Sequence, residues 1–136
     1  MKKLLIPVLT IGLIAELPLR ADDTPLAKAM QMVDDAYKTM RKTQDAAEGV
    51  KLAREAQEGV LKAITMTPEF VGKGAHPAGK EKAMVSYKKQ MARLFVVFCE
   101  MEEAFLAKDF AKVQELVTAL KEAKKQGHGE FMEEEE

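Results

Sequence analysis

The sequence predicts an all-α protein: an antiparallel up-down-up-down four-helix bundle preceded by a cleavable signal peptide. Three observations predict this fold. Four segments carry apolar residues at spacings of three and four, which is typical of one buried stripe on each of four helices. Short turns join the first helix to the second and the third to the fourth, and short connections favour antiparallel neighbours. No segment alternates apolar and polar residues over a useful length, so we expect no β-strands.

The N-terminal segment is typical of a signal peptide. Two lysines follow Met1, and a short apolar run continues to Ala15. Proline, glycine and glutamate interrupt or end this run, whereas a membrane-spanning helix needs about 20 apolar residues. We therefore expect cleavage after Ala21, export to the periplasm and no membrane anchor in the mature protein.

The mature chain is then one domain with an acidic end. We expect the bundle in residues 22–132 and a solvated tail in residues 133–136, for which docking to a basic partner is a weaker alternative. Residues 1–21 contain three of the 21 basic residues and one of the 22 acidic residues, so their removal leaves a net charge of −3. This charge does not suggest a nucleic-acid-binding protein.

Cys99 is the only cysteine, which excludes an internal disulfide bond. The chain also lacks the Cys-x-x-Cys-His motif, so covalent haem attachment through that motif is excluded. Because Cys99 lies beside an apolar helical stripe, we expect it to be a small buried core residue.

The first helix is expected over residues 25–42, because Asp23 or Thr24 can cap it and Pro25 suits a first helical turn. Its stripe consists of Leu26, Met30, Val33, Tyr37 and Met40. The second helix is expected over residues 45–66, and Thr67-Pro68 ends it because proline restricts the preceding residue and lacks an N–H donor. Its stripe consists of Ala46, Val50, Ala53, Gln57, Val60 and Ile64.

The third helix is expected over residues 80–107, after a long loop over residues 71–79 that contains three glycines and a proline. Its stripe consists of Met84, Tyr87, Met91, Leu94, Phe98, Met101 and Phe105. The fourth helix is expected over residues 109–128, with Phe110, Val113, Val117 and Leu120 on one face. At roughly 100° per residue, His128 falls close to the phase of Phe110 and Val117, so we expect an inward-pointing imidazole.

The predicted topology gathers distant residues at one end of the bundle. The first helix begins, the fourth ends, and the long connection crosses at this end. We therefore expect Met30, His128, the loop over residues 67–79, Tyr87 and Met91 to lie near one another, with both short turns at the opposite end.

Several chemistries lack the residues they need. A structural zinc site takes about four ligands at paired spacings, and the chain offers two histidines and one cysteine. No Glu-x-x-His motif is present for a di-iron centre. Gly72-Lys73-Gly74 is a turn rather than a phosphate-binding loop. We find no paired nucleophile and base, so we do not expect an enzyme.

One haem iron needs only two axial ligands, and methionine with histidine is an established pair. Periodicity alone does not select this chemistry, because a residue like Met30 is more often part of the core, and a histidine at a helix end is more often a helix cap or a surface group.

Three short motifs resemble a known family. They are Leu26-Ala-Lys-Ala-Met30 with the residues that follow it, Thr67-Pro68, and Leu120-Lys-x-x-Lys124-x-x-x-His128. Together they are similar to the soluble periplasmic cytochrome b562 family, and the resemblance covers most of the mature chain. It implies one non-covalent haem b whose iron is ligated by Met30 and His128.

The resemblance also implies the walls of the pocket. Val33 and Tyr37 would line the haem from the first helix, Pro68 from the loop, and Tyr87 and Met91 from the third helix. Each of these five residues is equally explained as ordinary core.

Lys124 stands where the family often has an arginine near a haem propionate, although a lysine in a last helical turn also suits the helix dipole. Two axial ligands leave no open coordination position, so the implied role is electron transfer to an unidentified redox partner protein by a monomer. The alternative is a haem-free exported helical module that binds a protein, or weakly binds a divalent metal through His76, His128 and the acidic tail.

Overall fold

The computed structural model describes residues 24–132, which form five α-helices and no β-strand. The helices are α1 (Pro25–Met40), α2 (Ala46–Ala63), α3 (Glu69–Gly72), α4 (Lys80–Leu106) and α5 (Phe110–Phe131). The prediction of an all-α protein is confirmed for this part of the chain. The predicted signal peptide, its cleavage site and the tail over residues 133–136 lie outside the described residues. None of the described helices has the length and apolar character needed to cross a membrane.

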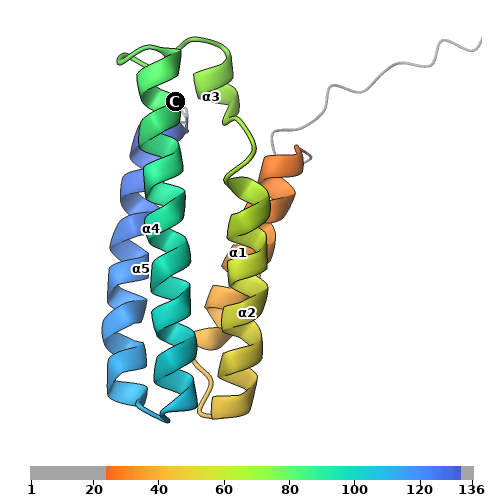
Figure 1. Ribbon diagram of the computed structural model, residues 1–136, viewed down its shortest axis with the longest axis vertical. Coiled ribbons are helices and arrows are strands. Elements are labelled where there is room, and N and C mark those ends of the chain that lie inside the picture. The colour runs from red at the N-terminus through yellow and green to blue at the C-terminus, as the bar shows by residue number, and fades with distance from the viewer. Residues whose placement is uncertain (1–23, 133–136) are drawn as a thin grey trace, which may run out of the picture.

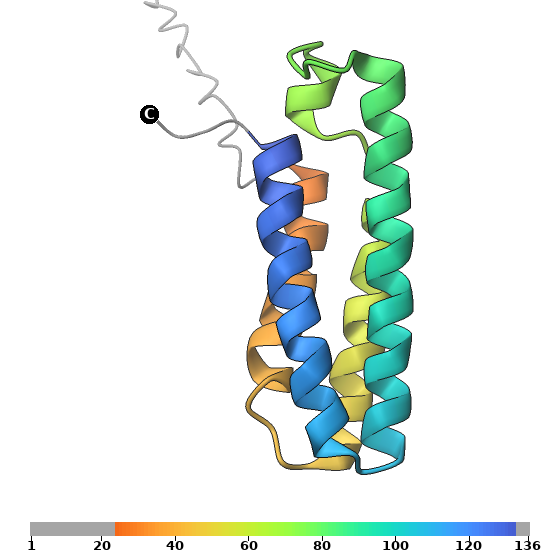
Figure 2. The same cartoon turned by 90° about the vertical axis from the view of Figure 1, so that its left-hand side faces the viewer.

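The four long helices lie side by side along one axis (Figures 1 and 2). The connections α1–α2 and α4–α5 lie at one end of the molecule, and α3 lies at the other, which we call the α3 end (Figure 1). The α3 end also holds the start of α1 and the end of α5 (Figure 2). Close packing joins α1 to α2, α2 to α4 and α4 to α5, whereas α1 and α5 pack together over no comparable length.

Side-chain caps fix where three of the long helices begin. Thr24 Oγ1 accepts a hydrogen bond of 3.0 Å from the backbone N–H of Ala27, and Pro25 occupies the first helical position. Asp45 and Asp109 likewise accept backbone N–H donors from the first turns of α2 and α5. Such caps satisfy N–H groups that have no partner within the helix.

Helix α2 packs mainly through small residues, which differs from its predicted stripe. Its buried residues are Gly49, Ala53, Ala56, Gly59, Val60 and Ala63. A Cβ added at Gly49 would lie 2.3 Å from Phe105 Cδ1, and one added at Gly59 would lie 2.7 Å from Val33 Cγ2. The absence of a side chain therefore lets α1 and α4 approach α2 closely. Of the predicted stripe, Ala53 and Val60 are buried and Val50 packs against the main core.

Other boundaries also differ from the prediction. Helices α1 and α2 end at Met40 and Ala63, two and three residues earlier than expected. The expected loop over residues 71–79 contains the second half of α3, which begins after Pro68. Helix α5 continues three residues beyond His128 to Phe131, even though Gly127 and Gly129 interrupt its side chains. Phe131 stabilises this extension, because its ring is buried in a small cluster at the α3 end.

Candidate functional site

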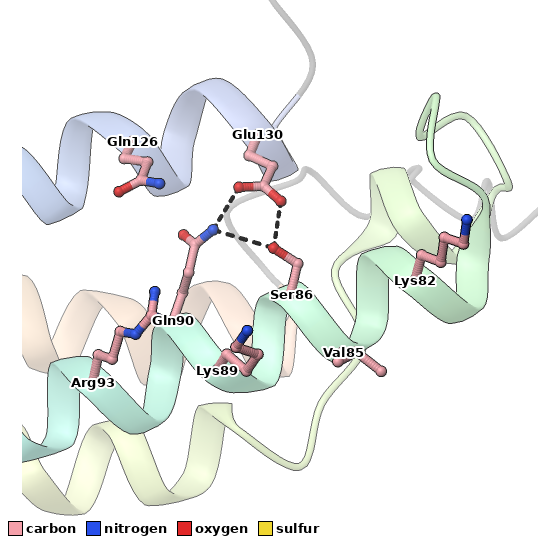
Figure 3. Close-up of a pocket in the computed structure, with 8 residues that line it drawn as sticks. All are labelled: Lys82, Val85, Ser86, Lys89, Gln90, Arg93, Gln126 and Glu130. Atoms are coloured by element: carbon pink, nitrogen blue, oxygen red, sulfur yellow. Dashed lines mark hydrogen bonds between the residues drawn. The ribbon is translucent and has the colours of Figure 1, made fainter.

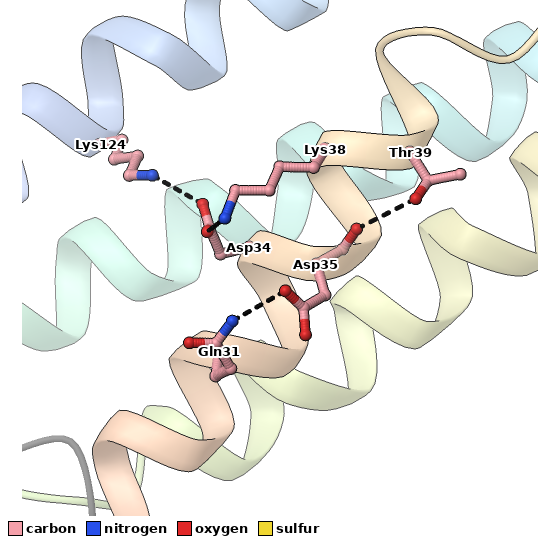
Figure 4. A network of polar contacts seen from close by, with 6 residues as sticks. All are labelled: Gln31, Asp34, Asp35, Lys38, Thr39 and Lys124. Atoms are coloured by element: carbon pink, nitrogen blue, oxygen red, sulfur yellow. Dashed lines mark hydrogen bonds and ion pairs between the residues drawn. The ribbon is translucent and has the colours of Figure 1, made fainter.

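The contact between α1 and α5, which we call the α1–α5 seam, is fastened by polar side chains (Figure 4). Lys124 Nζ of α5 lies 2.6 Å from Asp34 Oδ1 of α1, and Lys38 Nζ lies 2.7 Å from the other oxygen of the same carboxylate. Nearer the opposite end, Gln114 donates a hydrogen bond of 3.3 Å to the carbonyl of Arg41. The hydrogen bond from Lys124, followed by that from Lys38, lowers the pKa of Asp34 below its ordinary value.

The Asp34–Lys124 ion pair fixes the relative height of the two predicted iron ligands, Met30 on α1 and His128 on α5. Met30 precedes Asp34 by four residues, and His128 follows Lys124 by four residues. Each step is about one helical turn, or roughly 6 Å, toward the α3 end, with a rotation of only about 40°. Met30 and His128 therefore lie at about the same level on the two helices, one turn beyond the ion pair toward the α3 end.

Neither predicted ligand is part of the packed core. Met30 is half-buried and belongs to neither core cluster of the described residues, although Val33 and Tyr37 on the same stripe pack against the larger one. His128 is exposed, and its imidazole forms no hydrogen bond or ion pair with residues 24–132. The prediction of an inward-pointing imidazole is therefore wrong. The buried stripe of α5 is centred on Val113, Leu120 and Phe131, about 60° away from His128.

The predicted walls on α1 are already packed against protein. Val33 is 5% exposed and its side chain abuts Gly59 of α2. Tyr37 is half-buried against the main core, and the guanidinium of Arg41 lies 5.9 Å from the centroid of its ring. These two side chains line the inner side of α1 beside Met30.

The predicted walls from α3 and α4 lie at the α3 end. Pro68 is buried directly before α3, and Met91 is half-buried where the two core clusters meet. Tyr87 is buried, and its hydroxyl donates a hydrogen bond of 2.6 Å to the carbonyl of Ala63. Burial raises the pKa of Tyr87 to about 12. Tyr87 thus has a structural role that sequence reasoning did not anticipate.

A polar cluster that sequence reasoning missed fastens the end of α5 to α4 (Figure 3). Ser86 Oγ donates a hydrogen bond of 2.6 Å to Glu130 Oε1, and Gln90 Nε2 donates to Glu130 Oε2. His76 Nδ1 accepts a hydrogen bond of 3.1 Å from the backbone of Ala78, which leaves Nε2 to carry the proton, 4.0 Å from Glu130 Oε1. The carboxylate of Glu130 is therefore surrounded by donors from α4 and the loop.

Aromatic rings complete this fastening. The ring of Phe131 stacks on His76 at a centroid distance of 6.0 Å and meets Tyr87 edge-on at 5.5 Å. The sequence does hold a signal for Phe131, because it follows Val113 by 18 residues, which is five full helical turns. The prediction nevertheless ended this helix at residue 128.

The described residues do not form a conventional metal site. No group of three or more histidine, cysteine, aspartate or glutamate side chains within residues 24–132 is arranged to hold a metal ion. Cys99 is half-buried rather than fully buried, and burial followed by nearby glutamates raises the pKa of its thiol. Met30 and His128 carry a thioether and an imidazole, which are donor types that haem iron accepts.

Searches of known protein families, curated proteins and solved structures find no match to this chain.

Proposed function

We propose that the protein is an exported electron-transfer protein, an up-down-up-down four-helix bundle that binds one non-covalent haem b between Met30 and His128. The observation that carries this proposal is the Asp34–Lys124 ion pair at 2.6 Å. It joins α1 to α5, and Met30 and His128 each lie one helical turn further toward the α3 end. The donor chemistry supports the same assignment, because methionine and histidine are an established axial pair.

Met30 packs in neither core cluster, so no cluster contact opposes its binding to iron. The imidazole of His128 is exposed, and haem binding requires it to turn toward the α1–α5 seam. Buried Val33 and Tyr87, with Pro68, supply apolar surface that would keep water from the bound group. A haem held by two protein ligands exchanges electrons and has no open position for a substrate, so the proposed role is electron transfer in the periplasm.

Titration of the purified mature protein with haemin tests this proposal. We expect saturation at one haem per chain, with the sharp Soret band and the α and β bands of low-spin iron on reduction. A protein that leaves the haemin spectrum unchanged would overturn the assignment.

Ligand variants test the donors separately. Met30→Ala should leave a high-spin form ligated by His128, whereas His128→Ala should severely weaken haem retention. Met32→Ala is the matched control for Met30→Ala, because it removes a thioether from the same helix at a position away from the α1–α5 seam. Wild-type spectra in both ligand variants would refute the ligand assignment even if haem binds.

The alternative is a haem-free helical module that binds a protein partner. It is favoured by one observation, the set of lysines and arginine on α4 that have no acidic partner among the described residues. Thermal unfolding distinguishes the two functions, because a ligand that binds only the folded state raises the unfolding temperature. We expect haemin to raise it and zinc to leave it unchanged.

A further inference from the structure

A groove runs along α4 and α5 on the side of the molecule away from α1 (Figure 3). Its volume is about 310 Å³. Its residues are Lys82, Val85, Ser86, Lys89, Gln90 and Arg93 of α4, and Gln126 and Glu130 of α5. Ser86 and Gln90 donate hydrogen bonds to the carboxylate of Glu130. The other charged side chains of the groove are the cations Lys82, Lys89 and Arg93.

The charge of α4 changes sign along its length. Residues 80–93 contain five lysines and arginines and one acid, Glu81, whereas residues 94–106 contain three glutamates and no basic residue. None of the five cations forms an ion pair with a carboxylate in residues 24–132. By contrast, Glu102 in the acidic half is paired with Arg54 at 2.7 Å. The groove therefore holds three cations and one carboxylate, Glu130, which leaves it a net charge of +2.

An exposed apolar side chain lies among these cations. Val85 is 58% exposed and stands between Lys82 and Lys89 on the outer face of α4. Lys82 and Lys89 are seven residues apart, which is about 10 Å along the helix, and Arg93 lies one turn further. A second helix would match this pattern if it carried three carboxylates, with two turns between the first and second and one turn between the second and third. An apolar residue would lie between the first two.

We propose that this groove docks an acidic helical segment of a partner protein. Carboxylates of the segment pair with Lys82, Lys89 and Arg93, and an apolar side chain covers Val85. Complementary charge of this kind steers association and fixes the register of the two surfaces. The docking needs neither haem nor either proposed ligand, so its test is independent of the proposed electron-transfer function.

The probe is a synthetic alanine-rich helical peptide with glutamates seven and four residues apart and a leucine between the first two. Fluorescence anisotropy of the labelled peptide is measured with the full mature protein at low salt. We expect binding that weakens steadily with added salt, and at least about tenfold weaker binding to the triple variant Lys82→Gln, Lys89→Gln, Arg93→Gln. All three positions are on the protein surface, and circular dichroism confirms that the variant folds.

A charge-matched control removes three exposed lysines elsewhere: Lys42→Gln, Lys51→Gln, Lys108→Gln. Unchanged binding to this control supports the groove, and equal weakening in both triple variants would overturn it. Replacement of the peptide glutamates by glutamine should abolish binding. Double-stranded DNA that competes as well as the peptide would reassign the groove to polyanions in general. Binding that appears only after removal of residues 133–136 would assign the groove to the acidic tail of the same chain.

Discussion

Alanine in place of Gly127 and Gly129 should stabilise the last turns of α5. A Cβ at Gly127 would meet its nearest neighbour, Gln90 Oε1, at 3.7 Å, and one at Gly129 would meet nothing within 4 Å. Glycine in a helix interior is about 0.8–1 kcal/mol less favourable than alanine. Both positions lie within the last five residues of α5, where fraying reduces the gain. We therefore expect about 0.5–1 kcal/mol for each substitution.

Urea unfolding followed by circular dichroism measures this change in the free energy of unfolding. The double variant should gain about 1–2 kcal/mol, and each kcal/mol should raise the unfolding temperature by roughly 4 °C in a domain of this size. Gly59→Ala is the matched control with the opposite sign, because its Cβ would lie 2.7 Å from Val33 Cγ2 and 3.1 Å from the carbonyl oxygen of Ala29. We expect this substitution to lower the free energy of unfolding by about 1–3 kcal/mol.

The outcome tests whether α5 remains helical beyond His128. No gain from Gly129→Ala, or a loss from Gly127→Ala, would refute the helical extension to Phe131. Because these glycines flank the proposed histidine ligand, the same double variant also reports whether a stiffer last turn changes haem retention.

Three further predictions concern single side chains. Phe131→Ala should lower the free energy of unfolding by about 3–4 kcal/mol, because the ring is 7% exposed and meets Tyr87 edge-on; a change below about 1 kcal/mol in urea unfolding would contradict this. Tyr87→Phe should lower the free energy of unfolding by about 1 kcal/mol. It should also abolish a decline in stability between pH 10 and 12, because the pKa of Tyr87 is about 12 in the folded protein and lower in the unfolded chain. Asp34→Asn should lower the free energy of unfolding at neutral pH by less than about 1 kcal/mol. It should also remove part of the loss of stability below about pH 4, because the pKa of this carboxyl is lowered in the folded protein. An unchanged acid-unfolding curve would argue against the Lys124 contact.

The sequence predicted the long helices well because periodic apolar residues and capping side chains are local signals. Thr24 caps α1, as the sequence indicates, whereas Asp45 and Asp109 were predicted as first helical residues and instead cap α2 and α5. The packing face of α2 was less predictable. Its contacts come from Gly49 and Gly59, whose importance depends on the neighbouring helix that approaches them rather than on their own apolar character.

The candidate site was predicted only in part, for a similar reason. Periodicity places Val33 and Tyr87 inside the protein but does not say which partner each one meets. The contact of Val33 with Gly59, and the hydrogen bond from Tyr87 to the carbonyl of Ala63, depend on tertiary structure. The direction of His128 was wrong because the phase of Phe110 and Val117 marks the edge of the stripe rather than its centre.

The weak packing of α1 against α5 has a mechanical consequence. The other neighbouring helices are held by interlocking side chains, so parting them would empty a core. Parting α1 from α5 at the α3 end would mainly break the exposed Lys124–Asp34 ion pair, and such a pair contributes about 0–1 kcal/mol. Separation of α1 from α5 at the α3 end would therefore leave the packing of α1 on α2, of α2 on α4 and of α4 on α5 intact.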